Sequence, residues 1–441
     1  MKSSIRDVHA WEALDSRGRP TVACRVTVEG GGSGRAIVPS GASTGGHEAR
    51  ELRDHDGRYH GYGVQRAVEA VNTVLGPALL GRDSGDQVEI DTLLVELDGS
   101  SNLGRLGANA VLATSLAALL ATADEQRRPL WQTLSDSRTA LLPMPMVNII
   151  SGGAHADAAI DLQDILVVPV GAGSFREAME WVSLIRAACA EILEDKGVWT
   201  ALVADEGGLS GRLPSNESAL AAVTEAIVRA GLVPVDQVGL AIDVAANQIS
   251  SHGEITLALE RETLGTSVWL ERLAHWSSQY PILSWEDVLP EDEWAGWAQA
   301  TDVLQGLQLV GDDLFATNLD RLGRGINSGV ANAVLVKPNQ AGTVTRTRDV
   351  AEAAQANGYA TIVSARSGDT EDWWLADLAV GWRAGQIKVG STNRAERTAK
   401  WNRLLEIESM GGATFAGSAV IRGSRGVATA HLSYSTQDSH P

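Results

Sequence analysis

Two patterns of apolar and polar positions divide the chain. Up to about residue 135, a strand-like alternation in "TVACRVTVEG" is followed by helical periodicity as far as Asp124. Beyond the proline-containing segment "LLPMPMVNIISGG", short apolar runs alternate with stretches long enough to form a helix. This alternation predicts a parallel sheet with crossover helices, for which a closed β/α barrel is the commonest form at this length. We therefore expect an α+β domain over residues 1–135 and a barrel over 136–441.

Most of these runs stay apolar until their last positions and then end in an ionisable residue. The strands of a parallel barrel end at one mouth, where such folds carry their chemistry. Seven successive strands are therefore expected to point ionisable groups into one cavity. The groups are Asp205 with Glu206, Asp243, Glu286 with Asp287, Asp312 with Asp313, Lys337, Arg366 and Lys388.

Three of these carboxylates, Asp243, Glu286 and Asp312, follow consecutive expected strands and indicate a metal site. Any one of them alone would be interpreted as a turn former or a helix cap. As a set, they would repel and raise one another's pKa unless a cation neutralised them, so we expect a hard divalent metal. Mg²⁺ suits oxygen ligands and a phosphorylated or carboxylated substrate.

The remaining groups favour acid–base chemistry on an anion. Lys337 suits a general base, because nearby metal ions would lower the pKa of its ammonium group. A structural ion pair with Asp312 or Asp313 is the alternative interpretation. Glu206 precedes two glycines that permit a tight turn, and it could donate a proton to a leaving group. Fixed positive charge and hydroxyl donors for an anionic substrate would come from Arg366, Ser367 and Lys388.

Composition and charge narrow the class of ligand. A chain of 441 residues with 44% hydrophobic residues can bury a large core. Its net charge of -19 argues against nucleic acid and anionic membranes as partners. The two cysteines, Cys24 and Cys189, lack the spacing of a zinc site or a disulfide framework and fit a reducing compartment. We expect a cytoplasmic protein that binds a small anionic carboxylate.

No segment of the sequence predicts a signal peptide or a membrane span. The first residues, "MKSSIRDVHAWEALDSRG", contain no apolar core of the kind that a secretion signal needs. The most apolar stretch, "ANAVLATSLAALLATADE", is interrupted by Thr114 and Ser115. A buried helix packed through small residues is the better interpretation of that stretch.

Ordered motifs along nearly the whole chain resemble those of the enolase family. They include "VPSGASTGGHEARELRD", "MVNIISGGAHAD", "AIDVAANQI", "SWEDVLPEDEWAGW", "VLVKPNQAGT" and "RSGDTED". The resemblance implies an α/β fold in which an N-terminal α+β capping domain sits on a C-terminal modified (β/α)8 TIM-type barrel. It also implies a homodimer or higher homo-oligomer that binds Mg²⁺, as two ions.

The resemblance also implies a role for each site residue. Asp243, Glu286 and Asp312 would hold one metal ion, and Ser43 would help to hold a second. Lys337 would remove the proton next to the substrate carboxylate, while Glu206, with Asp164 beside it, would assist departure of the β-hydroxyl. The substrate would also be contacted by His155, Gln163, Arg366, Ser367 and Lys388.

Two departures from the family pattern fall in this site. The chain has "SARSG" where the family has "SHRSG", so Ala365 replaces a histidine that normally contacts the substrate phosphate. It has "QDI" where the family has "QEF", so the carboxylate of Asp164 is one methylene shorter than usual. A displacement of order 1 Å can cost roughly 100-fold in rate for an unchanged substrate. The two changes therefore predict retained metal and base chemistry on an altered substrate.

Three functions remain open from the sequence. The leading hypothesis is a Mg²⁺-dependent carbon–oxygen lyase, a hydro-lyase that forms an enolpyruvate from a modified 2-phosphoglycerate-like substrate. In this respect the chain resembles family members that make carboxyphosphonoenolpyruvate in phosphonate antibiotic biosynthesis. The alternatives are an ordinary glycolytic enolase, which interconverts 2-phosphoglycerate and phosphoenolpyruvate, and an inactive paralogue that serves as a binding protein.

Overall fold

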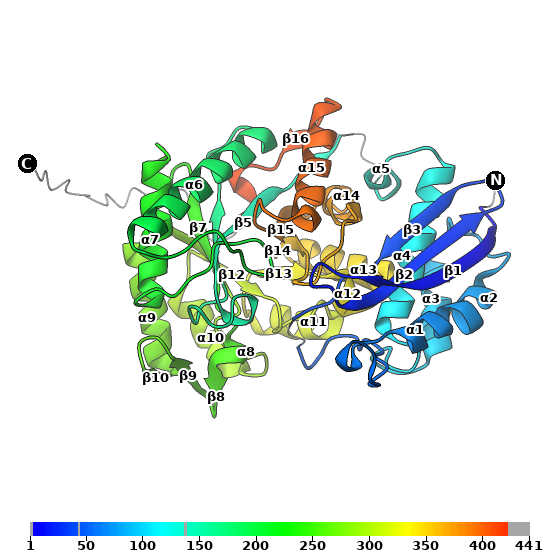
Figure 1. Ribbon diagram of the computed structural model, residues 1–441, viewed down its shortest axis with the longest axis horizontal. Coiled ribbons are helices and arrows are strands. Elements are labelled where there is room, and N and C mark those ends of the chain that lie inside the picture. Colours follow the sequence, from blue (N-terminus) through cyan, green and yellow to red (C-terminus); the bar gives the residue numbers. More distant parts are fainter. Residues whose placement is uncertain (1–2, 43–44, 136–138, 422–441) are drawn as a thin grey trace, which may run out of the picture.

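The computed structural model describes residues 3–42, 45–135 and 139–421, which form an N-terminal α+β part packed against a barrel (Figure 1). The N-terminal part contains an antiparallel sheet in the order β1-β2-β3. Its elements are β1 (Ile5–Leu14), β2 (Pro20–Val28), β3 (Ser33–Ile37), α1 (Gln65–Ala70), α2 (Gly76–Leu79), α3 (Gln87–Asp98), α4 (Ala108–Glu125) and α5 (Leu130–Thr133).

Helix α4 lies across this sheet as its main packing partner, and almost all of it is buried. Small residues allow the close approach: a Cβ on Gly34 of β3 would lie 2.1 Å from the carbonyl oxygen of Ala117. The interpretation of this apolar stretch as a buried helix is confirmed. Within the described part of the chain, we find no helix with the length and apolar character needed to span a bilayer.

The C-terminal part is built around a closed barrel of eight strands in the order β11-β12-β13-β14-β15-β5-β6-β7. Apolar side chains such as Met146, Leu166 and Leu335 fill its interior. The barrel strands are β5 (Met144–Ser151), β6 (Asp164–Val168), β7 (Gly239–Asp243), β11 (Ile282–Glu286), β12 (Gln308–Gly311), β13 (Ala333–Val336), β14 (Ala360–Ser364) and β15 (Gly385–Gly390).

Helices surround the barrel and connect its strands (Figure 1). The long helices are α6 (Phe175–Asp195), α7 (Asn216–Arg229), α9 (Thr266–Gln279), α10 (Trp294–Val303), α11 (Leu319–Ser328), α13 (Val344–Ala356), α14 (Trp374–Gly381) and α15 (Ala395–Ser409). Smaller elements are α8 (Ala246–Ile249), α12 (Pro338–Ala341), the sheet of β8 (Ser250–Ser251), β9 (Glu254–Leu257) and β10 (Glu262–Gly265), and the pair β4 (Leu141–Leu142) and β16 (Thr414–Phe415).

Helix α6 illustrates how the sequence directs these elements. It begins after Ser174, whose hydroxyl accepts a hydrogen bond from the backbone N–H of Glu177 at 3.1 Å. Buried positions then recur at helical spacing, as at Val182, Ile185 and Cys189. This period places one apolar face of the helix against the barrel.

One strand of the barrel differs from the expected parallel arrangement. β6 runs antiparallel to both of its neighbours, β5 and β7. The described residues between β5 and β6 form only a short 3₁₀ turn, Gly153–His155, and no crossover helix. Without a crossover, the chain can only return in the opposite direction, so the prediction of a fully parallel sheet was wrong here.

One further segment also differs from expectation. "ALVADEGG" was expected to be a strand, but it is a loop, because Gly207 has a left-handed φ of +84° and turns the chain. Glu206 therefore reaches the barrel mouth from a loop rather than from a strand end.

Candidate active site

Charged side chains from six barrel strands converge at the mouth, as expected. Asp243 and Glu286 are the last residues of β7 and β11 and are register partners. Asp312 and Lys337 come directly after β12 and β13, Arg366 follows β14 closely, and Lys388 lies on β15. Lys337 lies partly buried, and the other five residues are buried.

Lys388 bridges two of the expected metal ligands. Its Nζ lies 2.8 Å from Oδ2 of Asp243 and 2.8 Å from Oε2 of Glu286. Burial by itself lowers the pKa of Lys388, but attraction to these carboxylates outweighs it and raises the pKa well above its usual value. Burial and the neighbouring Asp243 raise the pKa of Glu286. The carboxylates are thus held together by a positive charge.

Lys337 forms an ion pair with Asp312, which also accepts a hydrogen bond from Nε2 of Gln340 at 2.9 Å. The pKa of Asp312 is lowered, because attraction to Lys337 outweighs burial. The pKa of Lys337 is raised for the same reason. The sequence predicted a lowered pKa for Lys337 in a cavity that contains metal ions. In the protein alone, Lys337 forms the structural ion pair with Asp312 that was the alternative interpretation.

The carboxylates at the mouth fit a hard cation. Ligand oxygens of Asp287, Asp312 and Asp313 lie within 4.8 Å of one another. Asp243 and Glu286 add buried oxygens, whose negative charge is balanced by Lys388. Such an oxygen-only donor set suits Mg²⁺. The expected ligand Ser43 lies outside the described residues.

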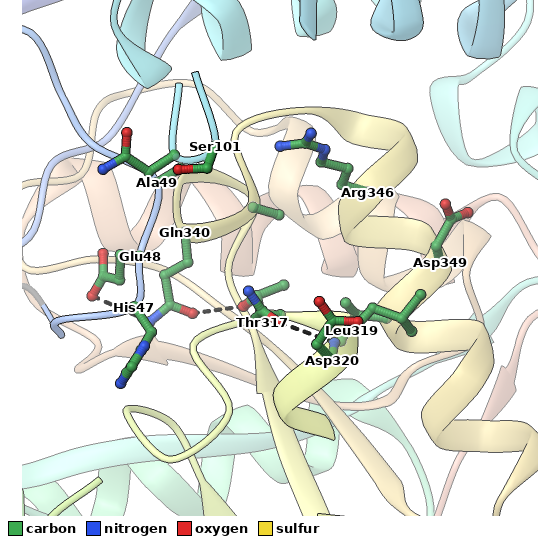
Figure 2. A pocket seen from close by; sticks show the side chains of 14 residues that line it. His47, Glu48, Ala49, Ser101, Thr317, Leu319, Asp320, Gln340, Arg346 and Asp349 are labelled. Carbon is green, nitrogen blue, oxygen red and sulfur yellow. Dashed lines mark hydrogen bonds between the residues drawn. The ribbon is translucent and has the colours of Figure 1, made fainter. Parts of the chain in front are cut away.

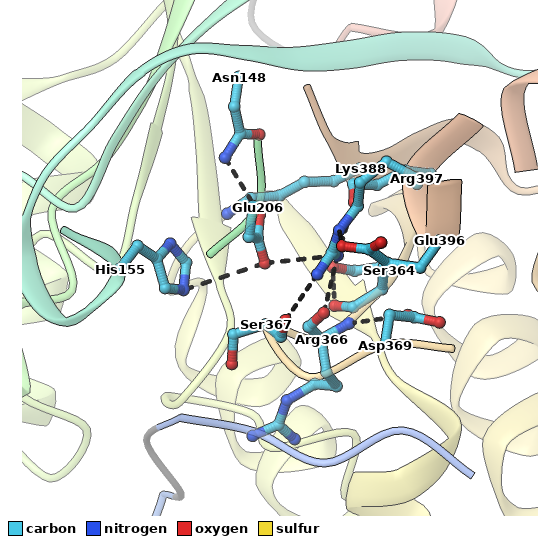
Figure 3. A network of polar contacts seen from close by, with 12 residues as sticks. Asn148, His155, Glu206, Ser364, Arg366, Ser367, Asp369, Lys388, Glu396 and Arg397 are labelled. Carbon is cyan, nitrogen blue, oxygen red and sulfur yellow. Dashed lines mark hydrogen bonds and ion pairs between the residues drawn. The ribbon is translucent and has the colours of Figure 1, made fainter. Parts of the chain in front are cut away.

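Glu206 lies between polar partners from three elements (Figure 3). Its Oε2 accepts a hydrogen bond from Nδ2 of Asn148 at 3.0 Å. Its Oε1 lies 3.9 Å from Nε2 of His155 and 3.8 Å from Nη1 of Arg397. Burial raises the pKa of Glu206, but the positive charges of His155 and Arg397 lower it further, to a net value below its usual range. Gly208 allows the loop that carries Glu206 to lie close to β5, since a Cβ on Gly208 would lie 2.4 Å from Oγ of Ser151.

Asp164 is close to Glu206 but faces a different partner. Its Oδ2 lies 2.9 Å from Nδ1 of His155, and its Oδ1 accepts a hydrogen bond from Oγ of Ser151 at 2.6 Å. The three ligand atoms of His155, Asp164 and Glu206 also lie within 4.8 Å of one another, close enough to hold a cation. The structure therefore brings Asp164 to the site behind the imidazole.

The turn after β14 presents the anion-binding residues. Nη1 of Arg366 donates hydrogen bonds to Oε2 of Glu48 at 2.8 Å and to Oδ1 of Asn339 at 3.2 Å. Oγ of Ser367 accepts a hydrogen bond from the backbone N–H of Ala42 at 2.6 Å. Ala365 is buried beside them and lines the cavity. The turn thus meets Ala42 and Glu48 of the N-terminal part.

The cavity enclosed by these groups is small, about 30 Å³. Ion pairs among its own side chains occupy the space, so a substrate must replace some of them. Gln163 contributes by donating from Nε2 to Asp243 at 3.1 Å. Asp287 and Asp313, which were expected at the mouth, also line the cavity. Sequence reasoning missed two other lining residues: Ser364, the last residue of β14, and Gln248, which lies in the matched motif "AIDVAANQI".

A larger cavity of about 340 Å³ lies next to the site, between the N-terminal part and the barrel (Figure 2). Glu48 and Gln340 form part of its wall. Both residues also contact the mouth, since Glu48 pairs with Arg366 and Gln340 bonds to Asp312. These two polar side chains therefore link the wall of the larger cavity to charged residues of the mouth.

A barrel mouth that gathers carboxylates, two lysines and an arginine beneath an α+β cap defines an enzyme of the enolase superfamily type. Comparison with protein families agrees with this class. The model of the enolase N-terminal domain matches residues 5–134, and that of the enolase C-terminal TIM barrel domain matches residues 139–424. The chain belongs to the enolase family, and the expected fold class is confirmed. Family membership makes it a lyase of this superfamily, whose members typically bind Mg²⁺.

Proposed function

We propose that the protein is a Mg²⁺-dependent hydro-lyase that forms an enolpyruvate from a modified 2-phosphoglycerate-like substrate, as in carboxyphosphonoenolpyruvate synthesis. The observation that carries the proposal is Ala365, a buried methyl group that lines the cavity directly before Arg366. A histidine at this position would be much larger than this methyl group. We infer that the alanine gives a further substituent on the substrate's phosphorus a place beside the guanidinium once the substrate replaces ion pairs of the cavity.

Lys337 is the proposed base. Bound Mg²⁺ would stabilise the negative charge that develops on the substrate carboxylate when the neighbouring proton is removed. In the protein alone, Asp312 holds Lys337 in its charged form. A cation shared with Asp312 would weaken that attraction, which lowers the pKa of the lysine and frees it to accept a proton.

Glu206 is the proposed acid for the departing β-hydroxyl. It lies in the cavity wall, bonded through Oε2 to Asn148, with Oε1 between His155 and Arg397. Both cations favour the carboxylate form, so the substrate must bring negative charge near Glu206 to raise its pKa. A substrate with an additional carboxyl group would supply such a charge.

Arg366, Ser367 and Lys388 are proposed to hold the anionic ends of the substrate. Arg366 now pairs with Glu48, which must move or share the guanidinium when an oxyanion binds. Arginine suits this exchange because its planar fork can bind two oxygens of a phosphoryl group. Lys388 would face the substrate carboxylate from the side of Asp243 and Glu286.

The localisation, oligomeric state, partners, number of metal ions and pathway of the protein are also proposals. We propose a cytoplasmic homodimer or higher homo-oligomer that takes no nucleic acid or membrane as partner, binds two Mg²⁺ ions, and serves phosphonate antibiotic biosynthesis. The strong negative charge of the chain supports the exclusion of polyanionic partners.

The first experiment measures the absorbance of phosphoenolpyruvate formed from 2-phosphoglycerate, with and without Mg²⁺, alongside calorimetric titration of Mg²⁺. We expect Mg²⁺ binding with little or no turnover of 2-phosphoglycerate, followed by turnover of a phosphonoformyl analogue. Rapid Mg²⁺-dependent turnover of 2-phosphoglycerate would instead identify an ordinary glycolytic enolase. Absence of Mg²⁺ binding would favour an inactive binding paralogue.

A double variant tests the pocket argument. Ala365→His together with Asp164→Glu restores both family residues and should raise turnover of 2-phosphoglycerate by roughly 100-fold over the unmodified protein. If the double variant gains nothing, these two positions do not determine substrate choice.

A further inference from the structure

The environment of Asp164 differs from that of an acid that meets a substrate. Its side chain is fully buried, and each of its oxygens has a short hydrogen bond: one from Ser151 at 2.6 Å and one with His155 at 2.9 Å. Among the described residues that line the cavity are His155 and Glu206, but Asp164 is not one of them. The shortened carboxylate therefore lies one side chain removed from the reacting atoms.

The imidazole of His155 connects Asp164 to Glu206. A carboxylate can only accept, so the 2.9 Å contact requires that Nδ1 of His155 carry a hydrogen. The other ring nitrogen, Nε2, then faces Oε1 of Glu206 at 3.9 Å. Figure 3 shows the ring directed at that carboxylate. The side chains thus form a row from Ser151 through Asp164 and His155 to Glu206.

The backbone of His155 reinforces this row. Its carbonyl oxygen accepts a hydrogen bond from the N–H of Asp205, the residue before Glu206, at 3.1 Å. The backbone N–H of Ser151 donates to Leu209 on the far side of the same loop at 2.9 Å. The loop that carries the proposed acid is thus fixed at both ends by residues that also contact Asp164.

We propose that Asp164 is a positioning residue, which holds the His155 ring with Nε2 toward Glu206 and acts on the reaction only through that histidine. The proposal rests on the proposed function, because it concerns the departure of the β-hydroxyl. It assigns to His155 the role of the group beside Glu206 that meets the substrate. In this chain the group beside Glu206 that can meet the leaving group is therefore the imidazole of His155 and not the carboxylate of Asp164.

The placement can be tested without substrate. Proton NMR of the full-length protein should show a strongly downfield resonance from the carboxylate-bound Nδ1–H of His155, assigned by its loss in His155→Gln. Asp164→Asn should remove or shift this resonance, and Ser151→Ala should shift it less. The matched control Asp157→Asn changes an exposed aspartate two residues from His155 and should leave it unchanged. An unaltered resonance in Asp164→Asn would overturn the placement.

A double-mutant cycle tests the role itself, with whichever substrate the protein turns over. Asp164→Asn should lower kcat roughly 10–100-fold with little change in KM, the size of loss typical when the partner that orients a metal-ligating histidine is removed. In the His155→Gln protein, the same substitution should have little further effect. An equal loss of kcat in both backgrounds would mean that Asp164 meets the substrate directly and would overturn the proposal. Because the cycle works with 2-phosphoglycerate as well, its outcome is separate from that of the proposed function.

Discussion

A single buried ammonium group, Lys388, holds together carboxylates that would otherwise repel. Lys388→Met leaves Asp243 and Glu286 buried without their cation. We expect the free energy of unfolding without Mg²⁺ to fall by about 3–5 kcal/mol. Saturating Mg²⁺ should restore more stability to this variant than it adds to the unmodified protein, because the freed oxygens bind the ion more tightly. Urea denaturation with and without Mg²⁺ measures both effects.

Lys400 provides the matched control for this prediction. It is also a buried lysine, paired with Asp369 at 2.6 Å. Lys400→Met should destabilise the protein to a similar extent, but Mg²⁺ should restore nothing beyond what it adds to the unmodified protein. Equal recovery of the two variants would contradict a cation site at Asp243 and Glu286.

His155 should make stability depend on pH. Burial lowers the pKa of its imidazole, but Asp164, Glu206 and Asp243 raise it more, to about 9 from 6.5. Because the folded pKa is raised, the stabilisation is fully present below pH 6.5 and is lost as pH rises through 9. The loss across this window is about 3 kcal/mol. His155→Gln should flatten this part of the curve of unfolding free energy against pH, whereas substitution of the exposed His275 should not.

Among the elements, helix α15 fixes the substrate-binding turn through one arginine. The fully buried Arg397 donates to the carbonyl oxygens of Arg366 at 2.7 Å, Ser367 at 2.6 Å and Val389 at 2.9 Å. A lysine cannot reach these three acceptors together. Arg397→Lys should therefore lower the free energy of unfolding by about 2–4 kcal/mol and raise KM for the anionic substrate.

The exposed Arg176 on α6 offers the same substitution without buried acceptors. Arg176→Lys should change stability by less than about 0.5 kcal/mol and leave KM unaltered. If Arg397→Lys neither lowered the free energy of unfolding nor raised KM, the turn would be held by β14 and β15 alone.

The sequence was most informative where a strand ends in a charged residue. The positions of Asp243, Glu286, Asp312 and Lys337 followed from apolar runs of strand length, because a barrel directs such ends to one mouth. The direction of β6 could not be predicted, because nothing in an apolar run records whether a crossover helix precedes it. Neither could the pairing of Lys388 with Asp243 and Glu286, which depends on contacts between strands far apart in the chain.

At the scale of the whole molecule, the site is completed by contact between the two parts. Residues on either side of the undescribed positions 43–44 meet the barrel: Ser40 forms a β-bridge with Gly368 beside the anion-binding turn, and Glu48 pairs with Arg366. Farther out, Asp372 accepts hydrogen bonds from the backbone N–H of Ile37 at 2.7 Å and from Arg35 at 2.9 Å. The N-terminal part therefore contributes to the stability of the turn that binds substrate as well as covering it.

The buried ion pair between Glu48 and Arg366 should be the strongest single contact across this junction. Both side chains are only 5% exposed. Glu48→Gln keeps the shape of the side chain but removes its charge, so we expect a loss of about 3 kcal/mol in the free energy of unfolding. Inorganic phosphate should restore part of it, because an oxyanion can replace the missing carboxylate beside the guanidinium.

The neighbouring residue His47 supplies the control. Asp292 pairs with His47 at 3.2 Å, but its side chain is 68% exposed. Asp292→Asn should therefore cost less than about 1 kcal/mol and show no added response to phosphate. If the two variants lost equal stability, or if phosphate stabilised Glu48→Gln no more than the unmodified protein, Arg366 would not be the point at which the N-terminal part and the substrate compete. Unequal losses with selective rescue would show that closure of the mouth and anion binding use the same guanidinium group.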